Sequence, residues 1–205
     1  MIRSRAGGLF LIGLLCLAPP LSAEQSTRLL EPWPEQRSRT YEVDKYPVAW
    51  RQKASKAEGV FAGVRFTAPT PPQQAWDLAT GYDDIGQGTA GVTSVKVTPL
   101  AEGRERIDVS LKVLWKRVTL HFDVERHPPE LVMFRLDNPR IGDYEGVCRF
   151  SPDGQGTRLE AATRFRPAMR GVPYRLMLLA ERITILNGIK SFLALCETAS
   201  EPGQS

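Results

Sequence analysis

The sequence predicts an α+β fold in which a curved antiparallel sheet closes over one long C-terminal helix. From Val92 onward, apolar and polar residues alternate for about 75 residues, with short turn-like segments between the runs. This pattern is typical of an antiparallel meander with one solvated face. Residues 174–198 then follow helical periodicity with a single apolar stripe. One such helix and one such sheet must bury each other's apolar surfaces.

Residues 1–23 are predicted to be a signal peptide. Two arginines precede an almost wholly apolar run, residues 6–18, which ends in two prolines and a small residue at Ala23. The run is shorter than the roughly 20 apolar residues that a membrane-spanning helix needs. We therefore expect cleavage after Ala23 and a periplasmic or secreted protein without a transmembrane anchor. Lipid attachment at Cys16 is disfavoured because the residue before it is bulky.

The charge of the remaining chain is close to balance. Without Arg3 and Arg5, the count of Lys and Arg falls from 27 to 25 against 23 acids, so the net charge falls from +4 to +2. A solvated surface of mixed charge is expected, and a nucleic-acid partner is not. Cys148 and Cys196 are too few for a disulfide scaffold. They are expected as two separate buried thiols, with a bridge in an oxidising compartment as the alternative.

Residues 24–58 are expected to form a polar N-terminal arm with one short strand near Tyr41–Val43. Prolines and charges interrupt any apolar period in this segment. The folded domain is expected to span residues 59–198, and residues 199–205 are expected to form a C-terminal tail.

The domain is predicted to begin with a strand, GVFAGVRFT, and a short helix. Thr70 is expected to cap this helix, which starts with Pro71, buries Trp76 and ends before Gly81. The Asp83–Asp84 pair follows at a turn, where carboxylates accept hydrogen bonds from backbone N–H groups. Adjacent side chains point in different directions, so the pair is expected to be structural rather than an acid–base catalyst.

The meander is predicted to continue through residues 106–115 and 117–125. The inward residues of these two strands are Ile107, Val109, Leu111, Val113, Trp115, Val118, Leu120, Phe122 and Val124. His121 falls on the solvent side, and His127 lies in a turn. LVMFRL is predicted as a further strand, and EGVCRF and TRLEAATRF flank a glycine-rich hairpin at residues 152–156. With no close spacing among histidines and cysteines, we predict no metal site, no cofactor and no catalytic residue.

The apolar stripe of the long helix contains one charged residue. The stripe consists of Tyr174, Leu178, Ile185, Leu186, Ile189, Phe192, Leu193 and Cys196. Arg182 falls near its middle, where an unpartnered guanidinium would be costly. Three roles remain open: it extends to water at the rim, it pairs with a carboxylate of the sheet, or it holds the anionic or carbonyl end of an apolar ligand.

Three stretches in this order resemble a known family: TAPTPPQQAWDLATGYDDI, HPPELVMFRLDNPRIGDYEGVCRFSPDGQGTRLEAATRF and LNGIKSFLALCE. Together they resemble the START-like (SRPBCC) superfamily, in particular its polyketide cyclase and coenzyme Q-binding branch, from about Gly59 to Glu197. The resemblance implies a helix-grip fold.

The leading functional hypothesis is an exported carrier or binding protein for a hydrophobic small molecule such as a lipid, isoprenoid or quinone. The expected ligand-binding residues are the inward aromatic residues of the sheet and the stripe of the helix: Phe122, Phe134, Phe150, Phe165, Tyr174, Leu178, Arg182, Ile185, Leu186 and Ile189. One alternative is an accessory protein that binds another exported protein, such as a periplasmic dehydrogenase, through its polar arm. The other is a cyclase-like or hydrolytic enzyme, for which Arg182, Tyr82 and Tyr174 are the candidate groups.

Overall fold

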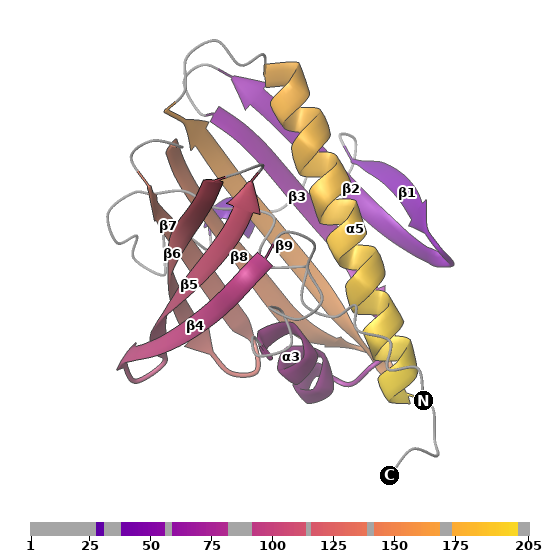
Figure 1. Cartoon of the computed structure of the whole chain (residues 1–205). Helices are drawn as coiled ribbons and strands as arrows, with labels where there is room; N and C mark the ends of the chain where they lie inside the picture. Colours follow the sequence, from indigo (N-terminus) through magenta and orange to yellow (C-terminus); the bar gives the residue numbers. More distant parts are fainter. Residues whose placement is uncertain are drawn as a thin grey trace.

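The protein folds into a curved nine-stranded antiparallel sheet with a long helix along its inner side (Figure 1). The computed structural model describes residues 28–30, 38–55, 59–81, 92–113, 116–138, 142–168 and 174–200. The predicted α+β class is confirmed. The elements, in chain order, are η1 (Arg28–Leu30), β1 (Arg39–Val43), β2 (Tyr46–Ser55), β3 (Gly59–Ala68), α3 (Pro72–Thr80), β4 (Val92–Ala101), β5 (Arg104–Val113), β6 (Lys116–His127), β7 (Leu131–Asn138), β8 (Gly142–Asp153), β9 (Gly156–Pro167) and α5 (Tyr174–Ser200).

The order of strands across the sheet is β1-β2-β3-β9-β8-β7-β6-β5-β4. Strands β4 to β9 form the predicted meander, and β3 pairs with β9, which places the N-terminal strands beside the last strand of the chain. The β8–β9 hairpin turns at Gly154, whose φ of +62° is a conformation that glycine adopts without strain. Every pairing in the sheet is antiparallel. Successive side chains along a strand point to opposite faces, so each strand has one inner and one outer side.

The segment before the predicted domain adds two strands to the same sheet. The predicted short strand near Tyr41–Val43 corresponds to β1, but the sequence pattern does not predict β2. In β2, Val48 and Trp50 are almost fully buried in the main core. Residues 38–55 are therefore part of the sheet, and a deletion through residue 55 would remove core side chains.

The inner faces of β5 and β6 carry the alternating side chains that the sequence predicts. The buried members are Ile107, Val109, Leu120, Phe122 and Val124. The side chains of Leu111, Val113 and Trp115 lie outside the described residues. Helix α3 closes one end of this core: Trp76 is 4% exposed, and its ring meets that of Phe150 edge to face at 5.5 Å.

The start of α3 differs from the prediction. Pro71, not Thr70, occupies the cap position, and no side chain caps the helix. The Thr70 side chain is fully buried, and its backbone carbonyl accepts a hydrogen bond of 2.6 Å from the Thr157 hydroxyl. The prediction that Thr70 caps the helix is thus wrong, because this residue joins the helix entry to the sheet instead.

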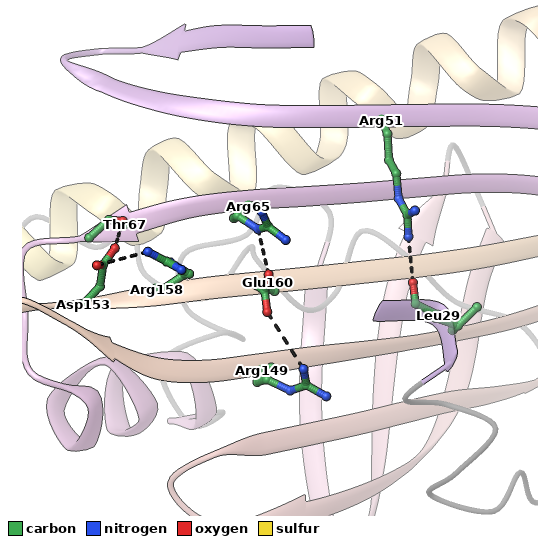
Figure 2. Close-up of polar contacts among 8 residues, drawn as sticks. All are labelled: Leu29, Arg51, Arg65, Thr67, Arg149, Asp153, Arg158 and Glu160. Carbon is green, nitrogen blue, oxygen red and sulfur yellow. Dashed lines mark hydrogen bonds and ion pairs between the residues drawn. The ribbon is translucent and has the colours of Figure 1, made fainter. Parts of the chain in front are cut away.

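The outer face of the sheet holds a second, smaller apolar cluster and a set of ion pairs (Figure 2). Helix η1 lies on this face, where the backbone carbonyl of Leu29 accepts a 2.9 Å hydrogen bond from Arg51. Glu160 lies between two cations, 2.7 Å from Arg65 and 3.9 Å from Arg149. Arg51, Arg65, Arg149 and Glu160 thus find their partners on the outer side of the sheet.

One glycine on the inner face makes room for an aromatic ring. Gly146 on β8 pairs with Phe134 on β7, and a Cβ at Gly146 would overlap the Phe134 ring. Phe134 itself is 8% exposed, so its ring has little space into which it can move.

Replacing Gly146 with alanine should therefore destabilise the fold by about 1–3 kcal/mol through overpacking. The measurement is the free energy of unfolding in urea. In a Phe134→Leu background the ring is gone, so the same glycine substitution should cost clearly less. Equal costs in the two backgrounds would contradict this assignment of the contact.

Candidate functional site

Three aromatic rings line the inner face of the sheet where β7, β8 and β9 run side by side. Phe134 and Tyr144 stack with ring centroids 6.3 Å apart, and Phe165 lies 5.8 Å from Tyr144. Tyr144 pairs directly with Phe165 across β8 and β9, so these side chains share one face of the sheet. We call Phe134, Tyr144 and Phe165 the aromatic cluster. The sequence predicts two of its three members as ligand-binding residues and misses Tyr144.

The remaining predicted site residues lie along the same inner side. Phe122 and Phe150 are buried in the core, and so are Ile185 and Ile189 of α5. Leu178 and Leu186 are half-buried. The Tyr174 side chain lies outside the described residues, as do Tyr82 and the Asp83–Asp84 pair. Of the described apolar residues of the predicted set, all but Leu178 belong to the main core or pack against it. Their role in ligand binding remains a prediction.

A carboxyl group lies in this apolar interface. Glu181, on α5 between Leu178 and Ile185, accepts a 2.9 Å hydrogen bond at Oε1 from the hydroxyl of Thr163 on β9. Burial raises the pKa of Glu181 to about 7, although the polar groups of Thr163 and Gln52 oppose this shift. The cause is the loss of water around the carboxylate, which favours the neutral form.

Strands β2, β3 and β9 position the partners of this carboxyl. Gln52 pairs with Ala62, and Ala62 pairs with Thr163, so the three form one row across the inner face. Gln52 also donates a 2.6 Å hydrogen bond to the backbone carbonyl of Leu178 and so ties β2 to the first half of α5. We call Glu181, Thr163 and Gln52 the polar triad.

The sequence and the fold both have known relatives. The sequence profile described as "Polyketide cyclase / dehydrase and lipid transport" matches residues 62–193. The chain belongs to this family. It is a START-like (SRPBCC) family whose members bind hydrophobic small molecules, so the resemblance seen in the sequence is confirmed. No curated protein matches the chain.

Several solved structures share the fold. The protein TTHA0849 from Thermus thermophilus is 19% identical with a TM-score of 0.58, over 69% of this chain and 99% of that one. The Zhui aromatase/cyclase from Streptomyces sp. R1128 is 17% identical with a TM-score of 0.54, over 69% and 96%. The STAR-related lipid transfer protein from Xanthomonas axonopodis is 10% identical with a TM-score of 0.54, over 78% and 98%. At these identities the likeness shows the fold alone.

Neither a metal site nor a membrane-spanning helix is found among the described residues. None of them gathers three or more His, Cys, Asp or Glu side chains in a way that could hold a metal ion. His121 is exposed on the outer side, as predicted, and contacts Asp108 at 2.8 Å. No helix in the described part of the chain has the length and apolar character to cross a membrane.

The two cysteines are free and buried, in agreement with the expectation of separate thiols. Burial raises the pKa of the Cys148 thiol. Burial also raises the pKa of Cys196, to about 11, against a smaller opposing effect of the nearby Thr70 hydroxyl. Neither thiol is therefore activated as a nucleophile at neutral pH.

The predicted charged residue of the stripe, Arg182, is half-buried. Its neighbour Glu181, which the sequence analysis does not single out, makes the polar contact with the sheet. The one signal that could have found Glu181 is its spacing, three residues after Leu178 and four before Ile185. The role of Arg182 as a ligand anchor remains a prediction.

The pKa of Glu181 predicts a pH-dependent stability. Its pKa is raised from an ordinary 4.5 to about 7, so the folded protein keeps this proton while the unfolded chain has already lost it. The free energy of unfolding should therefore fall as the pH rises from about 4.5 to about 7, by up to about 3 kcal/mol. Urea titrations across this range measure the fall.

Glu181→Gln should remove this pH-dependent fall in the free energy of unfolding, because glutamine does not titrate. The residues that face Glu181 from the sheet, Gln52, Ala62 and Thr163, do not titrate either, and Arg182 beside it is a permanent cation. The control is Glu197→Gln on the same helix, since Lys45 lowers the pKa of this exposed carboxyl. A fall that survives in Glu181→Gln would refute the assignment.

Proposed function

We propose that the protein is an exported carrier or binding protein for a hydrophobic small molecule such as a lipid, isoprenoid or quinone. The observation that carries the proposal is the composition of the interface between α5 and the inner face. On it lie the aromatic cluster, the core residues of α5 and the half-buried Glu181, whose Oε2 is buried. Ligand sites for apolar molecules combine such walls with a few polar groups that fix orientation.

The relatives support the class of ligand. The Xanthomonas axonopodis neighbour is named for lipid transfer, and the Streptomyces neighbour is named an aromatase/cyclase. For this chain we favour binding over catalysis, because the two thiols have raised pKa values and the described residues present no metal-ligand group.

Native mass spectrometry tests the carrier function. Purified protein should carry, or take up, an apolar molecule, and extraction with organic solvent should lower its mass to that of the bare chain. An unliganded mass together with no uptake of apolar probes would contradict the proposal.

Two neighbouring residues of β9 offer a matched pair of variants for this test. Ala161 belongs to the main core on the inner face, whereas Ala162 belongs to the outer cluster together with Leu29 of η1. Both substitutions to leucine should cost about 1–3 kcal/mol through overpacking. Only Ala161→Leu, which adds volume on the inner side, should also reduce ligand uptake. A similar loss in Ala162→Leu would indicate a general effect of instability.

Export is proposed from residues 1–23, whose charge and apolar run fit a signal peptide. The mature protein from a native host or a secreting strain should then begin at Glu24 and appear in the periplasm or the medium. Intact mass and N-terminal sequencing check this. Recovery of the full chain from the cytoplasm alone would contradict it.

A further inference from the structure

The polar triad leaves one hydrogen-bonding atom without a partner. Oε1 of Glu181 receives the Thr163 hydroxyl. Oε2 is buried and makes no hydrogen bond of ordinary distance and angle in the described part of the chain, although the Gln52 amide is near enough to lower the pKa of the carboxyl. A buried polar atom in this state costs free energy that a partner would recover. A leucine or isoleucine at this position of α5 would avoid that cost. Packing alone therefore does not account for a carboxyl here.

The surroundings of Oε2 indicate what kind of partner it would have. Beneath the helix, Ala62 of the row is fully buried and contributes only a methyl group. On the other side of Thr163 the paired residue is Gly146, and the Phe134 ring of the aromatic cluster fills the space over that glycine. The carboxyl thus stands where a wall of aromatic rings ends. A molecule that lies against the rings would bring its end to Glu181.

A hydroxyl group suits this carboxyl better than other polar ends. A hydroxyl both donates and accepts, so it can pair with Oε2 whether the carboxyl is neutral or ionised. A carboxylate would be repelled by the ionised form, and a hydrocarbon would leave Oε2 unpaired. The other members of the triad add only neutral donors, from Thr163 and Gln52.

We propose that the polar triad receives the hydroxyl group of an otherwise apolar, ring-containing ligand, with the hydroxyl bound at Oε2 of Glu181 and the ring against the aromatic cluster. This inference rests on the proposed carrier function and specifies the chemical class of its ligand. It assigns the polar end of the site to Glu181, whereas the sequence leaves three roles open for Arg182, a ligand anchor among them.

Three probes of matched shape separate the possibilities: 2-naphthol, 2-methylnaphthalene and 2-naphthoate. Calorimetric or fluorescence titrations of the full mature protein are made at about pH 8, where Glu181 is mainly ionised and 2-naphthol is neutral. We expect 2-naphthol to bind roughly ten- to a hundredfold more tightly than 2-methylnaphthalene, as a hydrogen bond to a charged group implies. We expect 2-naphthoate to bind most weakly.

The variants locate the preference. Glu181→Leu should remove the advantage of 2-naphthol while preserving or improving the binding of 2-methylnaphthalene. Glu181→Gln keeps a donor and an acceptor at the same place, so it should keep part of the advantage even if the leucine variant folds poorly. Glu197→Leu, on the same helix but in contact with Lys45 at the far end, should behave as wild type.

The outcomes distinguish the two proposals. If the wild type binds none of the three probes, both the carrier function and this inference are overturned. If 2-naphthol and 2-methylnaphthalene bind equally, or if 2-naphthol keeps its advantage in Glu181→Leu, only the inference fails. Preferential binding of 2-naphthoate that Arg182→Leu abolishes would also overturn it, in favour of an anionic ligand held by Arg182.

Discussion

The burial of the sheet's inner face by α5 is the constraint on which the rest of the structure depends. Phe192 and Leu193 of the helix are each 1% exposed, and Phe192 meets Phe66 of β3 edge to face at 6.2 Å. Because side chains alternate along a strand, this burial also fixes the register of the sheet. A slip of one residue in β9 would turn Ala161 away from the core. It would also direct the charged side chains of the outer face into the core.

The same constraint separates the charges of the molecule. On the outer face, Glu160 and its arginine partners remain partly hydrated, so each pair costs little and contributes little. On the inner face, Glu105 pairs with Arg126 at 2.6 Å and is thereby compensated. Glu181 has a neutral partner, Thr163, and its buried environment is expressed as a raised pKa. Of these two inner-face acids, Glu181 is thus the one that contacts a neutral group rather than a cation.

Much of the fold follows from the sequence because its periodicity is regular. Alternation in β5 and β6 places Ile107, Val109 and Phe122 correctly, and the glycine-rich segment correctly predicts the β8–β9 hairpin. The pattern of apolar and polar residues does not predict β2, because Pro47 and the charged Arg51 and Lys53 are typical of a polar segment outside a sheet. Those charges lie on the outer face, and only the pairing with β3 shows that Val48 and Trp50 point inward.

The candidate site could be predicted as a surface but not as a specific contact. On a helical wheel, Glu181 and Arg182 both fall within the arc that α5 turns toward the sheet, about 100° apart. The sequence cannot tell which one meets a strand, because that depends on the rotation of α5 and on the row formed by Gln52, Ala62 and Thr163. Glutamate and arginine also differ in the length of their side chains, and so in whether the charged group reaches water. An arginine can extend its guanidinium toward water, whereas a glutamate at the same depth holds its carboxyl near the backbone and must find its partners inside.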